Sequence, residues 1–330
     1  MFPARSILVV ALGGNALVHA GERPTAESQA RNATRAMHAV VELVRRGHRI
    51  VLTHGNGFQV GSILIRVQRS LGAAYALPLH LCVAESQGEI GLWIEQALQN
   101  ELRRRGMRRA VVGLLTQVQV DARDPAFARP SKPVGPWLSA GAARRLRRAG
   151  HTVAHERGRG WRRVVASPRP LAVDDSAVLR LLLRRGVIVI AAGGGGVPVV
   201  RTRSGDLRGV AAVIDKDFAA AVLARDVGAT GLVILTGEPC VYRDYRRSGQ
   251  RRLAHLGVAE ARRLLGEGQF PPGSMGPKIE AAIGFLEHGG RHVLITAART
   301  LAAALAGRAG TVLTRAGRPT RRAPRARSRA

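Results

Sequence analysis

Short continuous apolar runs recur along the chain, and they predict the strands of a parallel sheet. The clearest runs are residues 7–12, 187–192 and 232–235, with shorter ones at 49–53 and 293–296. Apolar runs of this length without polar alternation are typical of strands that are buried on both faces. Several of them end directly in glycines, so we expect the loops after the strands to gather at one edge of the sheet.

The segments between these runs have apolar residues at helical spacing. Residues 25–46 place alanine, methionine and valine side chains on one face, and Gly47 ends the segment. Residues 79–105 are predicted to be largely helical, with interruptions at Gly88 and Gly91. Alternating strands and helices predict an α/β chain whose mostly parallel sheet is covered by helices on both faces.

One region departs from this alternation. Residues 121–136 contain four prolines, which exclude a helix and a central strand. A helix and short strands are predicted after it, as far as residue 168. We therefore predict a small protruding subdomain or lid at about residues 121–168.

Charge and composition leave the class of partner open at first. The net charge of +30 allows a nucleic-acid-binding protein, but the arginines are spread along nearly every surface segment and only 4% of residues are aromatic. Residues 314–330 hold seven arginines and no acid, which predicts a disordered tail that binds nucleic acid only non-specifically. No apolar run approaches the length of a membrane helix, so we expect a cytoplasmic protein without a membrane partner.

Glycines and asparagines follow three of the predicted strands. They stand at Gly13, Gly14 and Asn15, at Gly55 and Asn56, and in the run 193–196. Such loops let backbone approach a ligand and leave N–H groups free for an anion. Alone, Gly-Gly after a strand is more often a plain turn, and for the run 193–196 a flexible turn and a phosphate-binding loop are about equally compatible with the sequence.

Lysine is rare, and its positions indicate phosphate chemistry. Among 52 basic residues only Lys132, Lys216 and Lys278 are lysines, and each lies beside a loop. A lysine ammonium is a compact charge that fits against phosphoryl oxygens, and phosphoryl transfer depends mainly on such positioned charges. Asp217 begins a predicted helix and either orients these lysines or acts as a simple N-cap.

Taken together, these residues make the chain resemble the carbamate kinases of the amino acid kinase superfamily. The resemblance runs in order from about residue 7 to residue 313. It includes Ala-Leu-Gly-Gly-Asn-Ala-Leu at 11–17, Thr-His-Gly-Asn-Gly at 53–57, Ser-Gln-Gly at 86–88, Lys-Pro-Val-Gly-Pro at 132–136, the glycines and Val-Pro at 193–198, Asp-Lys-Asp at 215–217 and Gly-Ser-Met-Gly-Pro-Lys at 273–278.

The resemblance implies an open αβα sandwich with the protruding subdomain, a homodimer, and reversible phosphoryl transfer between ATP/ADP and carbamate or carbamoyl phosphate with Mg²⁺. Residues 1–186 would hold the carbamate and phosphoryl end, and residues 187–313 the nucleotide. It implies catalytic roles for Lys132, Lys216, Asp217 and Lys278, and no protein metal ligand. Substrate and phosphate would lie at Gly13, Gly14, Asn15, Gly55 and Asn56, and nucleotide at Gly193, Gly194, Gly195, Tyr242, Met275 and Gly276.

Two departures from the family pattern keep alternatives open. Phe58 stands where the family has proline. The family's Thr-Asp-x-Asp-(Ala/Gly)-Val-Tyr is Thr-Gly-Glu-Pro-Cys-Val-Tyr at 236–242, without either of its two acids. The alternatives are another acyl-phosphate-forming kinase of the superfamily, and a non-catalytic relative that binds a small ligand or nucleic acid.

Overall fold

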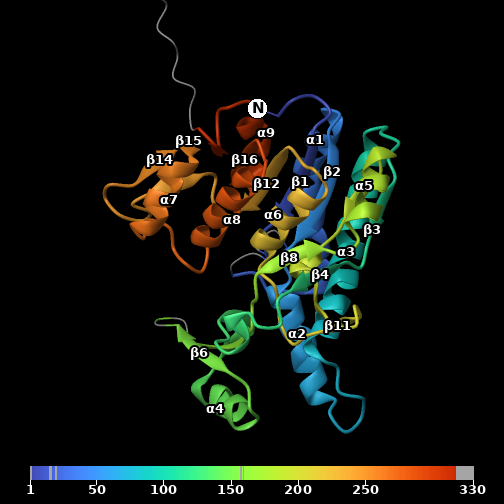
Figure 1. Cartoon of the computed structure of the whole chain (residues 1–330), viewed down its shortest axis with the longest axis vertical. Helices are drawn as coiled ribbons and strands as arrows, with labels where there is room; N and C mark the ends of the chain where they lie inside the picture. Colours follow the sequence, from blue (N-terminus) through green and yellow to red (C-terminus); the bar gives the residue numbers. More distant parts are fainter. Residues whose placement is uncertain (1, 15–16, 19–20, 157, 159, 317–330) are drawn as a thin grey trace, which may run out of the picture.

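A central sheet organises the molecule (Figure 1). It contains eight strands. The computed structural model describes residues 2–14, 17–18, 21–156, 158 and 160–316. The strand order is β15-β17-β16-β12-β1-β2-β9-β3, and the pairings are parallel except for β16 with β17. The strands are β1 (Ile7–Leu12), β2 (Arg49–His54), β3 (Val111–Gly113), β9 (Ile188–Ile190), β12 (Gly231–Thr236), β15 (His255–Gly257), β16 (His292–Ala297) and β17 (Thr311–Thr314).

Helices cover both faces of this sheet, which confirms the predicted sandwich. On one face Leu8 and Val10 of β1 pack in a core with α1 (Ala26–Arg45), α3 (Leu79–Arg104) and α9 (Leu301–Leu305). On the other face Val9 and Ala11 belong to a core that includes α5, α6, α7 and α8. These helices are α5 (Ser176–Arg184), α6 (Lys216–Asp226), α7 (Val258–Gly266) and α8 (Met275–Glu287). Side chains of β1 therefore point alternately into two apolar layers, which explains its unbroken apolar sequence.

The predicted protruding region contains its own small sheet, in the lower left of Figure 1. Its strands run in the order β5-β7-β6. β5 is an edge strand, so its prolines, which lack a backbone N–H, are tolerated because only one side of the strand is hydrogen-bonded. The elements are η2 (Pro125–Phe127), β5 (Lys132–Leu138), α4 (Ala140–Arg148), β6 (Val153–Glu156) and β7 (Gly160–Val165).

A second sheet supports the base of this region. It has the order β11-β10-β4-β8, so that β4, which leads into the region, and β8, which follows it, are antiparallel neighbours. Its strands are β4 (Gln117–Val120), β8 (Pro170–Val173), β10 (Val197–Arg201) and β11 (Leu207–Gly209), and a separate hairpin is formed by β13 (Val241–Arg243) and β14 (Arg251–Leu253).

The helix α2 (Gly57–Arg69) packs directly on β5. Gly61 of α2 faces Gly135 of β5, and a Cβ added at Gly61 would overlap the backbone of Gly135. Gly135 has a φ of +74°, in the left-handed region that favours glycine. The two elements therefore meet backbone against backbone.

Several details differ from the sequence predictions. The helix α3 runs without interruption through Gly88 and Gly91, because its partners α1 and β3 bury it along its length. The strand β9, with which the predicted nucleotide-binding half begins, lies between β2 and β3 of the first half. The predicted tail also starts too early. Thr314 belongs to β17, and Arg315 Nη2 donates to the carbonyl of Glu287 at 2.9 Å.

Residues 317–330 lie outside the described part of the chain. Within the described part, no helix combines the length and apolar content that crossing a lipid bilayer requires.

Candidate active site

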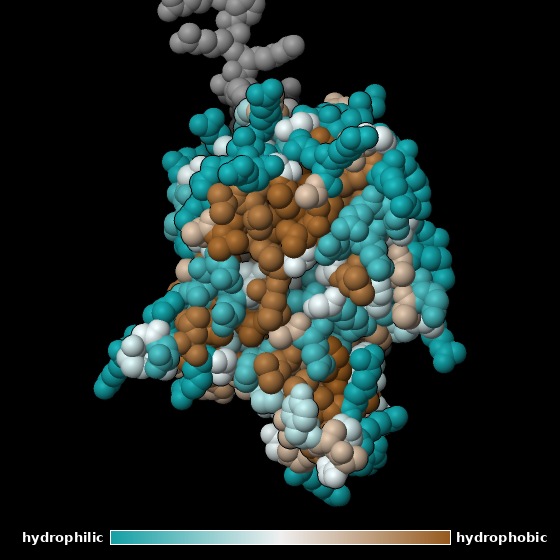
Figure 2. All heavy atoms as spheres, turned by 90° about the vertical axis from the view of Figure 1, so that its right-hand side faces the viewer, coloured by the Kyte–Doolittle hydropathy of each residue, from teal (hydrophilic) through white to brown (hydrophobic). Residues whose placement is uncertain are grey.

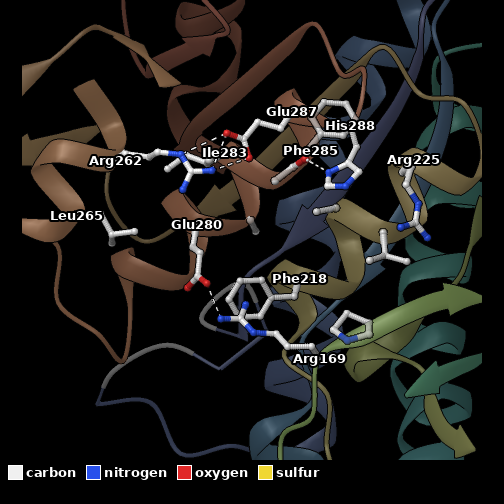
Figure 3. Close-up of a pocket in the computed structure, with 15 residues that line it drawn as sticks. Arg169, Phe218, Arg225, Arg262, Leu265, Glu280, Ile283, Phe285, Glu287 and His288 are labelled. Carbon is white, nitrogen blue, oxygen red and sulfur yellow. Dashed lines mark hydrogen bonds and ion pairs between the residues drawn. The ribbon is translucent and has the colours of Figure 1, made fainter. Parts of the chain in front are cut away.

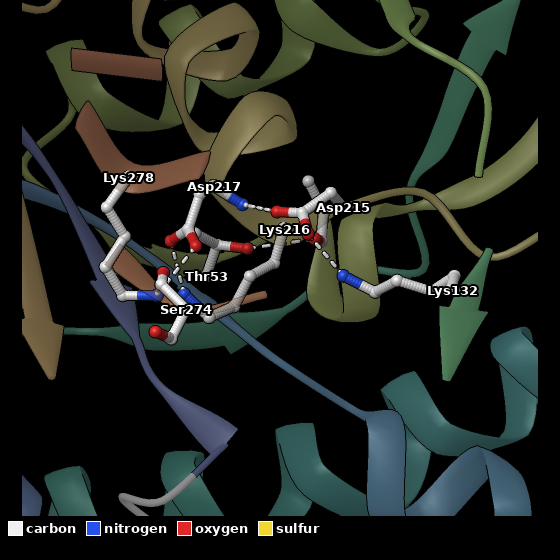
Figure 4. A network of polar contacts seen from close by, with 8 residues as sticks. Thr53, Lys132, Asp215, Lys216, Asp217, Ser274 and Lys278 are labelled. Carbon is white, nitrogen blue, oxygen red and sulfur yellow. Dashed lines mark hydrogen bonds and ion pairs between the residues drawn. The ribbon is translucent and has the colours of Figure 1, made fainter. Parts of the chain in front are cut away.

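Two lysines converge on one buried carboxylate, as Figure 4 shows. Asp217, in the first turn of α6, accepts hydrogen bonds from Lys216 Nζ at 2.5 Å on Oδ1 and from Lys278 Nζ at 3.0 Å on Oδ2. Lys278 lies in the first turn of α8 and also donates to the carbonyl of Ser274 at 3.2 Å. The fold thus brings together three residues that the sequence predicted as catalytic.

The third lysine reaches the same place from the protruding region. Lys132 is the first residue of β5, and its Nζ forms an ion pair with Asp215. Asp215 is the N-cap of α6, and its Oδ1 accepts the backbone N–H of Asp217 at 2.9 Å. One residue therefore starts the helix that carries Lys216 and also binds the lysine that arrives from outside. The sequence analysis did not single out Asp215, although aspartate before a predicted helix is a signal for an N-cap.

Burial makes this cluster electrostatically strong. Lys216 is 9% exposed and Asp217 is 3% exposed. Burial alone raises the pKa of the Asp217 carboxyl, but the ammonium groups of Lys216 and Lys278 outweigh it and hold the pKa well below its usual range. Burial lowers the pKa of Lys216, and the carboxylate of Asp217 opposes that shift. Three lysines share two aspartates, so positive charge remains in excess for an anion.

The first two glycine loops close on Lys216. The N–H of Gly13 donates to a carbonyl of β12 at 2.9 Å, and a side chain at this position would press on the same oxygen. A Cβ added at Gly55 would lie 3.1 Å from Cδ of Lys216 and 3.4 Å from the backbone nitrogen of Gly14. Glycine at position 55 lets backbone approach the lysine closely. Asn15 lies outside the described residues.

The second loop is held against α3 and the glycine run. Asn56 is buried, and its Nδ2 donates to Oγ of Ser86 at 2.8 Å. Gly194, with a φ of +65°, lies against this amide, and an added Cβ would overlap it. Gly193 lies equally close to the imidazole of His54. The sequence analysis noted Ser86 only within a family motif, and no local pattern marks it as the partner of Asn56.

This placement bears on the glycine run as a predicted nucleotide site. Gly193, Gly194 and Gly195 form the short helix η3 directly after β9, and β9 pairs with β2 and β3. Gly195 packs against the carbonyl of Ile214, immediately before the N-cap of α6. The run therefore lies with the loops of the first half. Its nucleotide role stays a prediction, and its neighbours favour the phosphoryl end of the site.

The imidazole of His54 is neutral in this setting. The residue is 1% exposed, and burial lowers its pKa to about 4. Its Nδ1 lies 3.2 Å from the carbonyl oxygen of Gly55, a geometry that fits donation by an Nδ1–H. His54 thus supports the second loop as an uncharged hydrogen-bond donor.

The predicted nucleotide residues outside the glycine run follow β12 and begin α8. Met275 and Gly276 form the first turn of α8, and the N–H of Gly276 donates to the carbonyl of Pro271 at 2.9 Å. Tyr242 is half-buried on β13, and its ring stacks on Tyr245 with centroids 5.9 Å apart. The fold therefore places Met275 and Gly276 in the same helical turn as Lys278, and Tyr242 on the hairpin of β13 and β14.

The acidic side chains of the cluster are occupied by lysines. Among the described residues, no group of three or more His, Cys, Asp or Glu side chains could hold a metal ion. Asp215 and Asp217, the acids of the cluster, are engaged by lysines.

Comparison with known proteins agrees with this architecture. The family model "Amino acid kinase family" matches residues 6–297, and the chain belongs to that family. Carbamate kinase of Pyrococcus horikoshii is 43% identical over 310 residues, which is 93% of this chain and 98% of that protein. Carbamate kinase-like protein YahI of Escherichia coli is also 43% identical, over 311 residues, 93% of this chain and 98% of that protein.

A solved structure extends the similarity to three dimensions. Carbamate kinase from Giardia lamblia bound to AMP-PNP is 38% identical and superposes with a TM-score of 0.87 over 94% of this chain and 99% of that chain. Within the amino acid kinase family, the chain belongs to the carbamate kinases, which are phosphotransferases.

Proposed function

We propose that the chain transfers a phosphoryl group reversibly between carbamoyl phosphate and ADP, giving carbamate and ATP. The observation that carries this proposal is the shared carboxylate of Asp217, which holds Lys216 and Lys278 side by side next to two glycine loops. In the transfer, the bond between phosphorus and the carbamate oxygen breaks while the bond to the terminal oxygen of ADP forms. The migrating group stays anionic throughout, so fixed ammonium groups are the contribution that it needs from the protein.

Each lysine has a distinct place in this scheme. Lys216 and Lys278 would face the migrating phosphoryl group from α6 and α8, and Asp217 binds one ammonium group on each carboxylate oxygen and so orients both. Lys132 arrives on the protruding region and contacts Asp215. It would transfer from that carboxylate to the phosphate of carbamoyl phosphate when the substrate binds.

The glycine loops would supply the remaining hydrogen bonds at the phosphoryl end. Gly55 lies against Lys216 and against the backbone nitrogen of Gly14, and Asn56 is fixed by Ser86. We assign the run 193–195 to this end as well, because it packs on Asn56 and His54.

Nucleotide would bind on the other side of the lysines. Met275 and Gly276 start α8 there, and Tyr242 lies on the adjacent hairpin. A Giardia relative is known bound to AMP-PNP, which supports ATP and ADP as the nucleotides, with Mg²⁺ held by their phosphates. The segment 236–242 is the part of this site that departs from the family pattern.

The test is ATP formation by the purified chain from ADP and carbamoyl phosphate, with acetyl phosphate as the control donor. Turnover with carbamoyl phosphate and much slower turnover with acetyl phosphate is the expected result. Preference for acetyl phosphate would favour another acyl-phosphate kinase. Nucleotide binding without turnover of either donor would favour a non-catalytic relative, a possibility that the altered segment 236–242 keeps open.

A homodimer is the assembly that we propose. Figure 2 faces the side of the molecule where α3, β3 and α5 lie, and it shows a broad apolar area. Large side chains in this part of the fold are about half exposed, namely Leu92, Leu115, Val178 and Leu181. An apolar patch can pair with its own copy around a two-fold axis, where a chain of charge +30 would otherwise repel itself.

The dimer can be tested by placing charges on this patch. Leu92→Asp with Leu181→Asp should give monomers in sedimentation, whereas Leu171→Asp on β8 should not. A wild-type monomer would refute the assembly.

A further inference from the structure

Arg169 joins the base of the protruding region to two helices of the main body. It lies between Pro168 and Pro170, on the connection from β7 to β8. Its guanidinium lies over the ring of Phe218, 3.7 Å from the centroid, and its Nη2 donates to Oε1 of Glu280 at 2.5 Å. Figure 3 shows these side chains at the edge of a cavity of about 380 Å³ between α6, α7 and α8.

Both partners are close in sequence to lysines of the site. Phe218 is two residues after Lys216 on α6, and Glu280 is two residues after Lys278 on α8. Residues two apart on a helix point to different sides. Arg169 therefore holds the outer side of the same helical turns whose inner side presents the lysines.

Arg169 also contacts the other connection of the protruding region. Its backbone N–H donates to Oδ2 of Asp124 at 2.8 Å, and Asp124 lies on the path from β4 to β5. That path leads to Lys132, the first residue of β5. The flanking prolines restrict the backbone of Arg169, so its position depends little on its own flexibility.

We propose that Arg169 is a positioning residue for phosphoryl transfer, which sets the protruding region, and with it Lys132, relative to α6 and α8. This inference rests on the proposed roles of the three lysines. It does not require Arg169 to touch substrate. A displacement of about 1 Å in a reacting group can lower turnover about 10²-fold. A contact that fixes the base of the protruding region can therefore affect kcat.

A purely structural role predicts a different result. The Arg169 and Glu280 side chains are 53% and 46% exposed, and exposed ion pairs contribute little to folding stability. The same cavity offers a matched control in Arg262 of α7, which binds both carboxylate oxygens of Glu287 at 2.6 and 2.7 Å. That pair is similarly exposed, and it connects α7 to the last turn of α8, far along the helix from Lys278.

The experiment compares Arg169→Ala, Arg169→Lys, Glu280→Ala and the double alanine variant with Arg262→Ala, all in the full chain. We expect kcat to fall about 10-fold in Arg169→Ala, with KM for ADP and the melting temperature nearly unchanged. Arg169→Lys should lie between Arg169→Ala and wild type, because it keeps the charge but not the flat stacking on Phe218. Glu280→Ala should lower kcat less than Arg169→Ala does. The double alanine variant should have the same kcat as Arg169→Ala, because Arg169 and Glu280 act as one unit.

The exchange Arg169→Glu with Glu280→Arg tests the contact itself. It should recover part of the kcat that Arg169→Glu loses, whereas Arg262→Ala should keep wild-type turnover. A kcat for Arg169→Ala within twofold of wild type would overturn the inference, and so would an equal loss in Arg262→Ala. If Arg169→Ala does not fold, the inference is tested by kcat of Arg169→Lys and by the recovery of kcat in Arg169→Glu with Glu280→Arg. Wild-type kcat in the first, or no recovery in the second, would overturn it. Failure of the proposed function is separate, since it would appear as no turnover of carbamoyl phosphate by the wild-type chain. Failure of the proposed lysine roles would appear as full turnover in Lys216→Arg and Lys278→Arg.

Discussion

Lys278 donates from Nζ to Oδ2 of Asp217 at 3.0 Å, although 61 residues separate them. The contact exists because α6 and α8 pack side by side and begin at the same edge of the sheet. The other oxygen of this carboxylate is occupied by Lys216. An ionised acid between two ammonium groups reduces their mutual repulsion and lets both stand near one phosphoryl group.

Replacing these lysines by arginine tests the site most directly. Lys216→Arg and Lys278→Arg keep the charge, but the planar fork does not fit one small anion as a compact ammonium does. We expect kcat to fall by about 10²–10³, with little change in melting temperature. Lys132→Arg should be milder and should act partly on KM for carbamoyl phosphate. Steady-state kinetics in the direction of ATP formation provide the measurement.

The matching controls exchange arginine for lysine on the surface. Arg45 of α1 pairs with Glu42 one turn away and is largely exposed, so Arg45→Lys should leave turnover unchanged. Near-wild-type turnover in both Lys216→Arg and Lys278→Arg would remove the basis of the proposed site.

The glycine run allows a test that separates strain from position. Gly194 and Gly228 have nearly the same positive φ, +65° and +68°. A Cβ at Gly228 would meet open space, whereas one at Gly194 would overlap Asn56. Both alanine variants should lose about 1–2 kcal/mol of stability because a positive φ disfavours a side chain. Gly194→Ala should lose more than Gly228→Ala, because its Cβ also overlaps Asn56. Only Gly194→Ala should lose activity, by about 10²-fold, because it displaces the second loop. Equal activities would mean that the run is only a turn.

His54 should make folding stability depend on pH. Its pKa in the folded state is about 4, below the usual value of 6.5, because the neutral ring is buried. Between these pH values the unfolded chain binds more protons, so stability is full above about 6.5 and is lost as pH falls toward 4. The contribution is about 3 kcal/mol at most. Urea midpoints at several pH values should show this slope, and His54→Gln should flatten it, whereas His255→Gln on the surface should not.

The segment 236–242 can be tested by restoring the family's acids. The carbonyl of Gly237 accepts from Arg299 at 3.2 Å and that of Pro239 accepts from Thr296 at 3.2 Å, so the segment is tied to the end of β16. Gly237→Asp with Pro239→Asp should tighten ADP binding in calorimetry and leave kcat nearly unchanged. Gly266→Asp, an exposed glycine on α7, controls for the added charge. An unchanged affinity would show that the segment only connects strands.

Removal of the arginine-rich end should separate polyanion binding from catalysis. Truncation after residue 316 should keep activity and melting temperature, and should weaken heparin binding and reduce its salt dependence. Truncation before Thr314 should be destabilising, because it removes part of β17 and the Arg315 side chain that bonds the carbonyl of Glu287. Loss of turnover after removal of residues 317–330 alone would place the end of the chain in the active site.

The sequence predicted the main strands well because each one is buried on both faces and is therefore continuously apolar. β1 was predicted with its observed bounds, Ile7–Leu12. The helix α2 was not predicted, because it begins at Gly57 within a glycine motif that reads as a loop. Gly88 and Gly91 were wrongly expected to interrupt α3, because tertiary packing outweighs the low helix propensity of isolated glycines.

The site could be predicted only as far as residue type carries the signal. Rarity marked the three lysines, and their acid Asp217 lay next to one of them. The sequence does not distinguish Ser86, Ser274 and Glu280 from other residues of their type. Their roles become visible only through their contacts with Asn56, Lys278 and Arg169. Position within the sheet was also hidden. That β9 pairs with β2, and so brings the glycine run to Asn56, is a property of topology that a single sequence does not display.

The contact of Gly61 with Gly135 limits how this family member can vary. A tight spot between two side chains can be relieved by shrinking the partner, so that one mutation compensates for another. Here both residues are already the smallest available, and the crowding is between main chains. No second-site change at this contact can therefore rescue a larger residue at either position. In a saturation library both positions should tolerate glycine alone, and covariation between them should be absent even though they touch.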